Sequence, residues 1–319
     1  MSVSLLNINN LSVSFKTDKG PIKVVSNLFF DIKKAEVFGL VGESGCGKSL
    51  TALSILGILP SNAFAEGEIS FNNKNLLTLR DAEMRNLRGK DISMIFQEPM
   101  TSLNPVLTIG YQIAEALVTH FGISKKEAMD RTVELLKAVK IPSPELRIKD
   151  YPHQMSGGMR QRVMIAMAIA CNPSLLIADE PTTALDVTIQ AQILELLQGL
   201  RKERDMAILL ITHDLSIISE QADRVAIMYA GRIMELTDVD ELFRNPLHPY
   251  THGLLQSLPV AKGVALKPIT GFVPNPENLP AGCKFSDRCY LASDECRRSE
   301  PELVEISGNH FVRCIKIRQ

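Results

Sequence analysis

Glycine, lysine and serine are closely spaced in Gly42-Glu43-Ser44-Gly45-Cys46-Gly47-Lys48-Ser49, which follows an apolar run at residues 36–41. Such glycines let backbone N–H groups converge on an anion, the lysine adds positive charge, and the serine hydroxyl can bind Mg²⁺. The apolar run predicts a buried strand, and residues 48–59 predict a helix ended by Pro60. This context favours a phosphate-binding loop over a chance glycine turn. The predicted contacts are Gly42, Ser44, Gly45, Cys46, Gly47, Lys48 and Ser49.

Two acidic residues, Asp179 and Glu180, follow the apolar run at residues 175–178. From a strand end, Asp179 can reach the same Mg²⁺ through water, because magnesium keeps part of its hydration shell. The next side chain points the other way, so Glu180 is predicted to orient or deprotonate the water that attacks a terminal phosphate. By itself the pair could equally cap a helix. The upstream phosphate loop favours metal and water.

A second candidate anion site is Ser156-Gly157-Gly158, which opens a predicted helix. Because the chain already holds one phosphate site, this second one suggests a nucleotide shared between two subunits. Gln97 and His213 follow predicted strands at residues 92–96 and 207–212, at the strand ends where open α/β sheets bind ligands. Each alone is typical of an ordinary polar surface or core position. Together with the acids, they are interpreted as sensors of the γ-phosphate.

Composition argues against several classes of protein. The chain has 319 residues, 45% of them hydrophobic, and 35 Lys and Arg against 36 Asp and Glu give a net charge of −1. Without a basic field, nucleic-acid binding is disfavoured. The apolar runs fall short of the ~20 residues of a spanning helix, and the N-terminal residues lack the pattern of a signal peptide. We therefore expect a cytoplasmic protein.

The predicted elements form an α/β core. Alternation within residues 5–32 predicts an antiparallel sheet with a turn at Lys19-Gly20-Pro21. Further strands at residues 92–96, 175–178, 207–212 and 225–229 are joined by helices. An all-helical insert is expected at about residues 100–170, with a capping box at Ser124-Lys125-Lys126-Glu127. Because composition changes beyond it, we predict one domain at residues 1–240 and an irregular, cysteine-containing extension at residues 241–319.

In this order the motifs resemble those of the ATP-binding cassette (ABC) ATPases, over about residues 1–240. The resemblance implies a P-loop NTPase core with an N-terminal antiparallel β subdomain and a helical subdomain. Residues 42–49 match the Walker A motif, Gln97 the Q-loop, residues 156–158 the signature, residues 175–180 the Walker B motif, residues 184–186 the D-loop and His213 the switch histidine. Two departures, Met159 after the signature and Ala35 at a turn where glycine is common, remove no charged catalytic group.

The resemblance also implies roles for individual residues. Phe15 is expected to stack on adenine, and Asp186 to contact the nucleotide site. ATP hydrolysis is assigned to Glu180, His213, Lys48 and Gln97, and Mg²⁺ binding to Ser49, Gln97 and Asp179.

Residues 97–105, 151–159 and 178–188, together with His248-Pro249-Tyr250-Thr251, are similar to one branch, the ATPase subunits of peptide importers, and most to the dipeptide-type first subunit. This similarity implies import of di- or oligopeptides, with nickel or glutathione as alternative cargo. It implies ATP-driven pairing with a second, related but unlike ATPase subunit, two transmembrane permease subunits and, indirectly, an external peptide-binding protein. The expected location is the cytoplasmic face of the membrane.

Four cysteines, Cys283, Cys289, Cys296 and Cys314, crowd the extension. In a reducing compartment such a group indicates metal binding more often than disulfides. Four thiolates suit an iron–sulfur cluster or Zn²⁺, although the missing Cys-x2-Cys pair weakens both signals, and free thiols are a third possibility. Similarity to the C-terminal cysteine motif of the branch favours a [4Fe-4S] cluster.

Three rival classes fit less well. DNA-maintenance ABC ATPases insert long coiled-coil arms between Q-loop and signature, whereas 58 residues (98–155) separate Gln97 from Ser156 here. A translation factor with two cassettes in one chain needs about twice this length. A module in which ATP only holds a complex together needs no Glu180.

Overall fold

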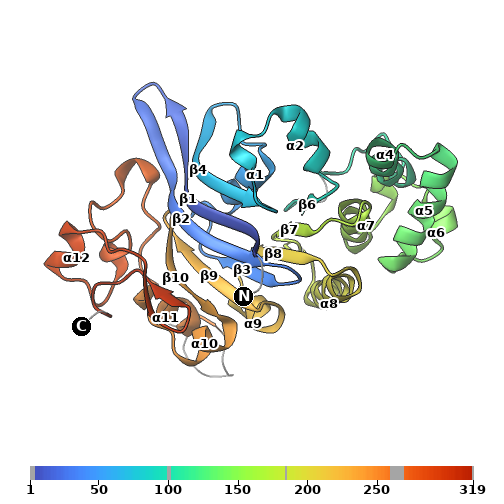
Figure 1. The fold of residues 1–319 in the computed structure, drawn as a ribbon. Coiled ribbons are helices and arrows are strands. Elements are labelled where there is room, and N and C mark those ends of the chain that lie inside the picture. Colours follow the sequence, from blue (N-terminus) through green and yellow to red (C-terminus); the bar gives the residue numbers. More distant parts are fainter. Residues whose placement is uncertain (1–3, 99–101, 184, 259–268, 318–319) are drawn as a thin grey trace. The chain divides into compact units, whose positions relative to one another are not determined.

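The computed structural model describes residues 4–98, 102–183, 185–258 and 269–317. The chain forms two compact units, one made of residues 1–78 and 210–319 and the other of residues 79–209. We call them unit 1 and unit 2, and Figure 1 shows the elements of both.

Unit 1 contains an antiparallel sheet built from the N-terminal part of the chain. Strands β1 (Ser4–Thr17) and β2 (Gly20–Lys33) form a long hairpin in which Thr17 pairs with Gly20 (Figure 1). Strands β4 (Ala63–Phe71) and β5 (Lys74–Asn75) complete the order β2-β1-β4-β5. The predicted antiparallel hairpin is confirmed, but its turn is Asp18-Lys19 and not Lys19-Gly20-Pro21, because Gly20 and Pro21 already pair within the hairpin. Strands β4 and β5 were not predicted.

A second sheet of unit 1 carries the phosphate loop. Strand β3 (Val37–Val41) runs parallel to β9 (Arg224–Tyr229), which pairs antiparallel with β10 (Arg232–Asp238). All five residues of β3 are buried, as its apolar run predicted. The helices of this unit are α1 (Lys48–Leu56), α9 (Leu215–Gln221), α10 (Val239–Arg244), α11 (Pro249–Gln256) and α12 (Asp294–Arg298).

Helix α1 ends earlier than predicted. Gly57, with a φ of +62°, donates its N–H to the carbonyls of Leu53 and Ser54 and so ends the helix at Leu56. Glycine adopts this left-handed conformation without strain. Pro60 was therefore the wrong stop signal.

The C-terminal tail is more ordered than its composition indicated. Strand β12 (His310–Val312) pairs antiparallel with β10, placing Val312 opposite Glu235, and β11 (Val304–Ser307) pairs with β12. The tail also forms the 3-10 turns η3 (Pro276–Asn278) and η4 (Ser286–Arg288). These two strands depart from the irregular tail that was predicted, because strands this short leave little periodicity in the sequence.

Unit 2 holds the helical segment and two parallel strands, β6 (Ile92–Ile95) and β7 (Leu175–Asp179). Its helices are α2 (Asp81–Leu87), α4 (Ile109–Phe121), α5 (Lys125–Ala138), α6 (Pro144–Arg147), α7 (Gly157–Ile169) and α8 (Val187–Arg204). Ser124 caps α5 by accepting from the N–H of Glu127, as predicted, while the Glu127 carboxylate pairs with Arg131. Strand β8 (Ala207–Thr212) begins in unit 2 and ends in unit 1.

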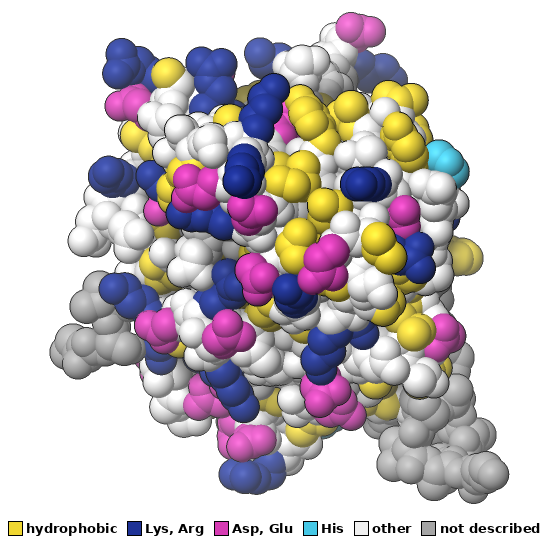
Figure 2. All heavy atoms as spheres, turned by 90° about the vertical axis from the view of Figure 1, so that its right-hand side faces the viewer, with side chains coloured by type: hydrophobic (Ala, Val, Ile, Leu, Met, Phe, Trp, Pro, Cys, Tyr) yellow, Lys and Arg dark blue, Asp and Glu magenta, His cyan; other side chains and the backbone are white. Residues whose placement is uncertain are grey.

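Figure 2 views the molecule from the side of α4, α5 and α6, where basic, acidic and hydrophobic side chains are interspersed. Within α5, ion pairs join Arg131 to Glu127 and Lys137 to Glu134, and Lys137 also pairs with Glu145 of α6. Among the described residues, no helix is long and apolar enough to cross a bilayer.

Candidate functional site

The phosphate loop connects β3 to α1 in unit 1. Lys48 is 6% exposed, and its Nζ donates to the carbonyl oxygens of Gly42 at 2.7 Å and Glu43 at 3.1 Å. Gly42 is required sterically, since an added Cβ would lie 2.1 Å from the Met228 carbonyl oxygen. Gly47 has a φ of +105° and no side chain to cap α1, so the first N–H groups of that helix can serve an anion.

The residues of the phosphate loop differ in their exposure to solvent. Ser44, Gly45 and Ser49 are exposed, while Cys46, Gly47 and Lys48 are buried. Burial raises the pKa of the Cys46 thiol, which keeps it protonated and unreactive. The Cys46 carbonyl accepts from the N–H of Gly231, which ties the loop to the turn between β9 and β10. Backbone groups, the lysine and the Ser49 hydroxyl can thus receive phosphates and a hard cation.

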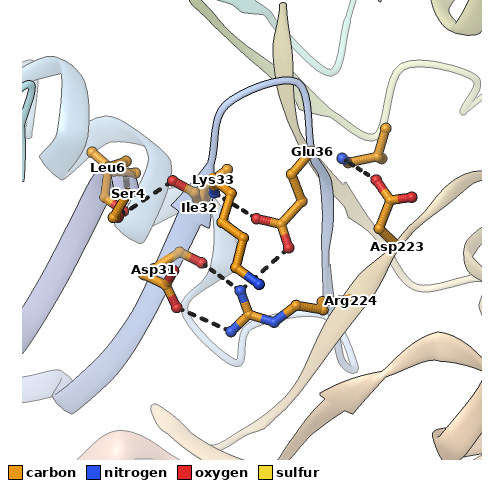
Figure 3. A network of polar contacts seen from close by, with 9 residues as sticks. Ser4, Leu6, Asp31, Ile32, Lys33, Glu36, Asp223 and Arg224 are labelled. Carbon is orange, nitrogen blue, oxygen red and sulfur yellow. Dashed lines mark hydrogen bonds and ion pairs between the residues drawn. The ribbon is translucent and has the colours of Figure 1, made fainter. Parts of the chain in front are cut away.

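A polar network fixes the strand that leads into the loop (Figure 3). Arg224 on β9 binds Asp31 Oδ1 through Nη2 at 3.0 Å and Glu36 Oε1 through Nη1 at 3.2 Å. Next to it, Asp223 accepts from the N–H of Val37, the first residue of β3, at 2.7 Å. Burial raises the pKa of Glu36, an effect opposed by the Lys33 N–H and by Arg224. The network joins β2, β3 and β9.

Ala35 lies in the turn before β3 and has a φ of +55°. Glycine adopts this left-handed conformation without strain, which explains why it is common at this position.

In unit 2 the predicted catalytic acid is held by two side chains. Gln97 Nε2 donates to Glu180 Oε2 at 3.1 Å, and the Thr183 hydroxyl donates to the same oxygen at 2.9 Å. Glu180 has a φ of +46°, an uncommon conformation for a non-glycine residue, and such outliers often mark functional positions. Asp179 is buried at the end of β7. The reading of this pair as a helix cap was wrong, because Asp186 caps the next helix, α8.

Thr183 was not predicted as part of the site. Its hydroxyl lies three residues after Glu180, a spacing at which a turn allows the two side chains to meet. The sequence Glu180-Pro181-Thr182-Thr183 offered this turn as a signal.

The Ser-Gly-Gly turn starts α7, as predicted. Ser156 accepts from the N–H of Met159 at 3.3 Å, and both Ser156 and Gly157 are exposed. A Cβ on Gly158 would approach Ile189 of α8 within 2.9 Å, so a small residue lets the helices pack closely. Gln161 Nε2 donates to the Pro181 carbonyl at 2.6 Å. The exposed turn is therefore linked through α7 to the residue that follows Glu180.

The remaining predicted residues lie in both units. His213 is exposed directly after β8, and half-buried Phe15 lies on β1 opposite Ile22. Asp186 accepts from the N–H of Ile189 at 2.9 Å, while Ala184 of the same motif lies outside the described residues. Unit 1 thus carries the phosphate loop, Phe15 and His213. Unit 2 carries Gln97, Asp179, Glu180, Asp186 and the Ser-Gly-Gly turn.

The four tail cysteines line one small pocket of unit 1 together with His248 and Phe285. Cys283 and Cys296 are also joined by a backbone hydrogen bond of 2.8 Å. Burial raises the pKa of Cys283 to about 11 and also raises the pKa of Cys289 and Cys314. The thiol donors and apolar walls suit a soft metal or cluster. The cavity is only about 10 Å³, and the described residues hold no preformed metal-binding group of His, Cys, Asp or Glu.

Comparisons with known proteins identify the family. The model "ABC transporter" matches residues 25–183, and the model "Oligopeptide/dipeptide transporter, C-terminal region" matches residues 234–296. The oligopeptide transport ATP-binding protein AppD of Bacillus subtilis is 53% identical over 98% of this chain and 96% of its own. The dipeptide transport ATP-binding protein DppD of Haemophilus influenzae is 53% identical over 98% of this chain and 95% of its own.

Solved structures agree with this relationship. A dimeric ATP-binding cassette in a post-hydrolysis state with ADP and Pi is 28% identical and superimposes with a TM-score of 0.66, covering 73% of this chain and 98% of that one. The cbiO1 subunit of a Clostridium perfringens ABC transporter complex is 28% identical, with a TM-score of 0.64, over 76% of this chain and 91% of that one. This chain has the ABC ATPase fold and belongs to the ATP-binding proteins of the oligopeptide/dipeptide ABC transporter family.

Proposed function

We propose that this chain hydrolyses ATP to power the import of di- or oligopeptides by an ABC transporter. The observation that carries the proposal is the 53% identity to peptide-transport ATP-binding proteins, which extends over 98% of this chain and includes its cysteine-rich tail. The phosphate loop, the Gln97–Glu180–Thr183 group and the exposed Ser-Gly-Gly turn supply the groups that such hydrolysis needs.

Each site residue would have its own role in ATP hydrolysis. Lys48 would exchange its two loop carbonyls for phosphate oxygens, and the first turn of α1 would donate N–H groups to them. Glu180, oriented by Gln97 and Thr183, would accept a hydrogen bond from the attacking water. His213 would stabilise the charge that develops on the γ-phosphate, and Phe15 would stack on the adenine.

The oxygen donors of Ser49, Asp179 and Gln97 fit Mg²⁺. All three are hard ligands, and Gln97 uses its amide nitrogen for Glu180, so its amide oxygen can still serve as a ligand. When bound, Mg²⁺ neutralises charge on the phosphate oxygens.

The exposed Ser156 and Gly157 support a role in a partner's site. We propose that their turn meets the γ-phosphate bound by a second, related ATPase subunit, with Asp186 close to the shared nucleotide. A relative that was solved as a dimer with ADP and Pi is consistent with this arrangement.

Of the two transmembrane permease subunits, one would dock on this chain, at the groove near residues 97–105 that is lined by Ile95, Phe96, Met164 and Met167. The chain would then act at the cytoplasmic face of the membrane and depend indirectly on an external peptide-binding protein. We place the nucleotide-binding domain at residues 1–240 and the transporter-specific extension at residues 241–319. No step of this function calls for nucleic acid.

The cysteine pocket is proposed to hold a [4Fe-4S] cluster, with Zn²⁺ as the alternative. The convergence of four thiols between apolar walls supports this proposal, and opening of the 10 Å³ cavity would be required. Because buried thiols must lose protons to bind metal, binding should release protons. Broad visible absorption of anaerobically purified protein would support the cluster, whereas a colourless protein with stoichiometric zinc would contradict it.

The decisive test of function compares the wild-type transporter with its Glu180→Gln variant in liposomes. Removing a catalytic base should lower ATPase kcat by about 10²- to 10⁴-fold while ATP still binds. Equal hydrolysis would contradict the role of Glu180. Stimulation of the wild type by dipeptides, and not by nickel or glutathione, with the matching binding protein would support peptide cargo.

A further inference from the structure

An arginine of the cysteine-rich tail binds the phosphate loop directly. Arg288 Nη1 donates to both carboxylate oxygens of Glu43, at 2.9 and 3.0 Å, across 245 positions of sequence. The Arg288 side chain is 6% exposed and that of Glu43 is 31% exposed, so this charge-assisted contact is partly buried. Its Nε also donates to the Thr270 carbonyl at 2.9 Å, and its guanidinium lies 5.6 Å from the centre of the Tyr229 ring.

The other side of Glu43 is held by helix α11. The Tyr250 hydroxyl accepts from the Glu43 N–H at 3.2 Å, and the Glu43 carbonyl accepts from Lys48 Nζ at 3.1 Å. Every polar group of Glu43 therefore has a partner within unit 1. Glu43 therefore anchors the start of the phosphate loop through its side chain as well as through its backbone.

The turn that ends at Arg288 leads directly into a residue of the cysteine pocket. Arg288 ends η4, and Cys289 follows it at once. Phe285, just before η4, lines the cysteine pocket and packs against both Tyr229 and Tyr250, with ring centres 5.2 Å apart in each case. Movement of the cysteine segment would thus displace Arg288 and Phe285 together, and with them the anchors of Glu43.

We propose that Arg288 is a positioning residue through which the C-terminal extension sets the affinity of the phosphate loop for ATP. The inference rests on the proposed ATPase function. Arg288 acts on Glu43 and not on phosphate, so its contribution is to hold residues 43–47 ready to receive the anion without reordering. Its loss should weaken ATP binding and leave the chemical step intact once ATP is saturating.

The test uses the full-length chain and, for turnover, the assembled transporter. Arg288→Gln should raise the Kd for Mg-ATP at least about 10-fold while kcat at saturating ATP stays within about twofold. Glu43→Gln should have a similar effect, and the double variant should bind no more weakly than the worse single variant, because both remove one interaction. Arg288→Lys should recover part of the affinity.

A matched control separates positioning from general loss of the tail. Arg232 on β10 pairs with Glu300 of the tail and is 14% exposed. Arg232→Gln removes a comparable tail-to-sheet ion pair, and the Kd for ATP should stay within about twofold of wild type.

Three results overturn the inference: an unchanged Kd in Arg288→Gln, an equal rise in Arg232→Gln, or strictly additive effects of Arg288→Gln and Glu43→Gln. If Arg288→Gln does not fold, Glu43→Gln measured against Arg232→Gln decides. Failure of the wild type to bind or hydrolyse ATP would instead contradict the proposed function.

Discussion

Replacing Arg224 by methionine should destabilise unit 1 strongly, because it leaves a buried carboxylate without its countercharge. Glu36 is 6% exposed and Arg224 is 11% exposed, so water can replace little of the lost interaction. Methionine keeps an apolar stem beside Phe38, whose ring lies 5.5 Å from the guanidinium carbon. The substitution thus removes charge more than packing.

Breaking one side of a buried ion pair costs about 3–5 kcal/mol, so Arg224→Met should lower the free energy of unfolding by that amount. The loss should depend on pH. A carboxyl group whose pKa is raised by folding stabilises the protein fully below its unfolded pKa, and that contribution is lost as the pH rises through the folded pKa. Without Arg224 the pKa of Glu36 rises further, so the destabilisation should be larger at pH 8 than at pH 5.

Urea-induced unfolding followed by far-ultraviolet circular dichroism at both pH values measures these differences. Arg224→Met combined with Glu36→Gln should recover at least about half of the loss, since the charge of the buried Glu36 is then gone and only Asp31, 33% exposed, is left without Arg224. Arg244→Met is the control, because Arg244 is 77% exposed and lies 4.0 Å from Glu241, and it should cost less than about 0.5 kcal/mol. A loss below about 1 kcal/mol, or an equal loss at both pH values, would refute this reasoning.

Three further substitutions test the nucleotide site. Gly42→Ala should abolish detectable ATP binding, because the new Cβ would lie 2.1 Å from the Met228 carbonyl oxygen; normal affinity would show that the loop can move aside. Ser156→Arg should preserve ATP binding by the isolated chain and block hydrolysis by the assembled transporter, and retained turnover would speak against a shared site. Thr183→Ala should lower kcat by about 10-fold, because Glu180 would be oriented less tightly. An unchanged kcat would show that Thr183 has no such role.

The sequence predicted best what depends on neighbouring residues. The phosphate loop could be found because its glycines, lysine and serine fall within eight positions and because a strand and a helix must flank it. The cap at Ser124 and the helix that starts after Ser156 depend on equally local patterns.

What the sequence did not reveal depends on distant pairings. Strand β4 contains Gly67, whose φ of +105° accompanies close backbone approach to Asn10, and this interrupts the alternation that marks a strand. Arg288 and Glu43 are joined only by the fold, so neither residue type nor spacing indicated their contact. Asp186 is an exception, because a local pattern could have identified it as an N-cap: it directly precedes a helix with one apolar face.

The pairing of β12 with β10 sets an order of events during synthesis. Strand β10 is complete at Asp238, yet the strand that covers its edge begins at His310. At the usual ~5–20 residues per second, the ribosome needs several seconds to deliver the missing strand. During that interval the nascent chain displays an open sheet edge, which can pair with other chains. Arg288 is also synthesised long after the phosphate loop. A chain that ends before residue 288 would therefore leave the ribosome without this anchor of the loop.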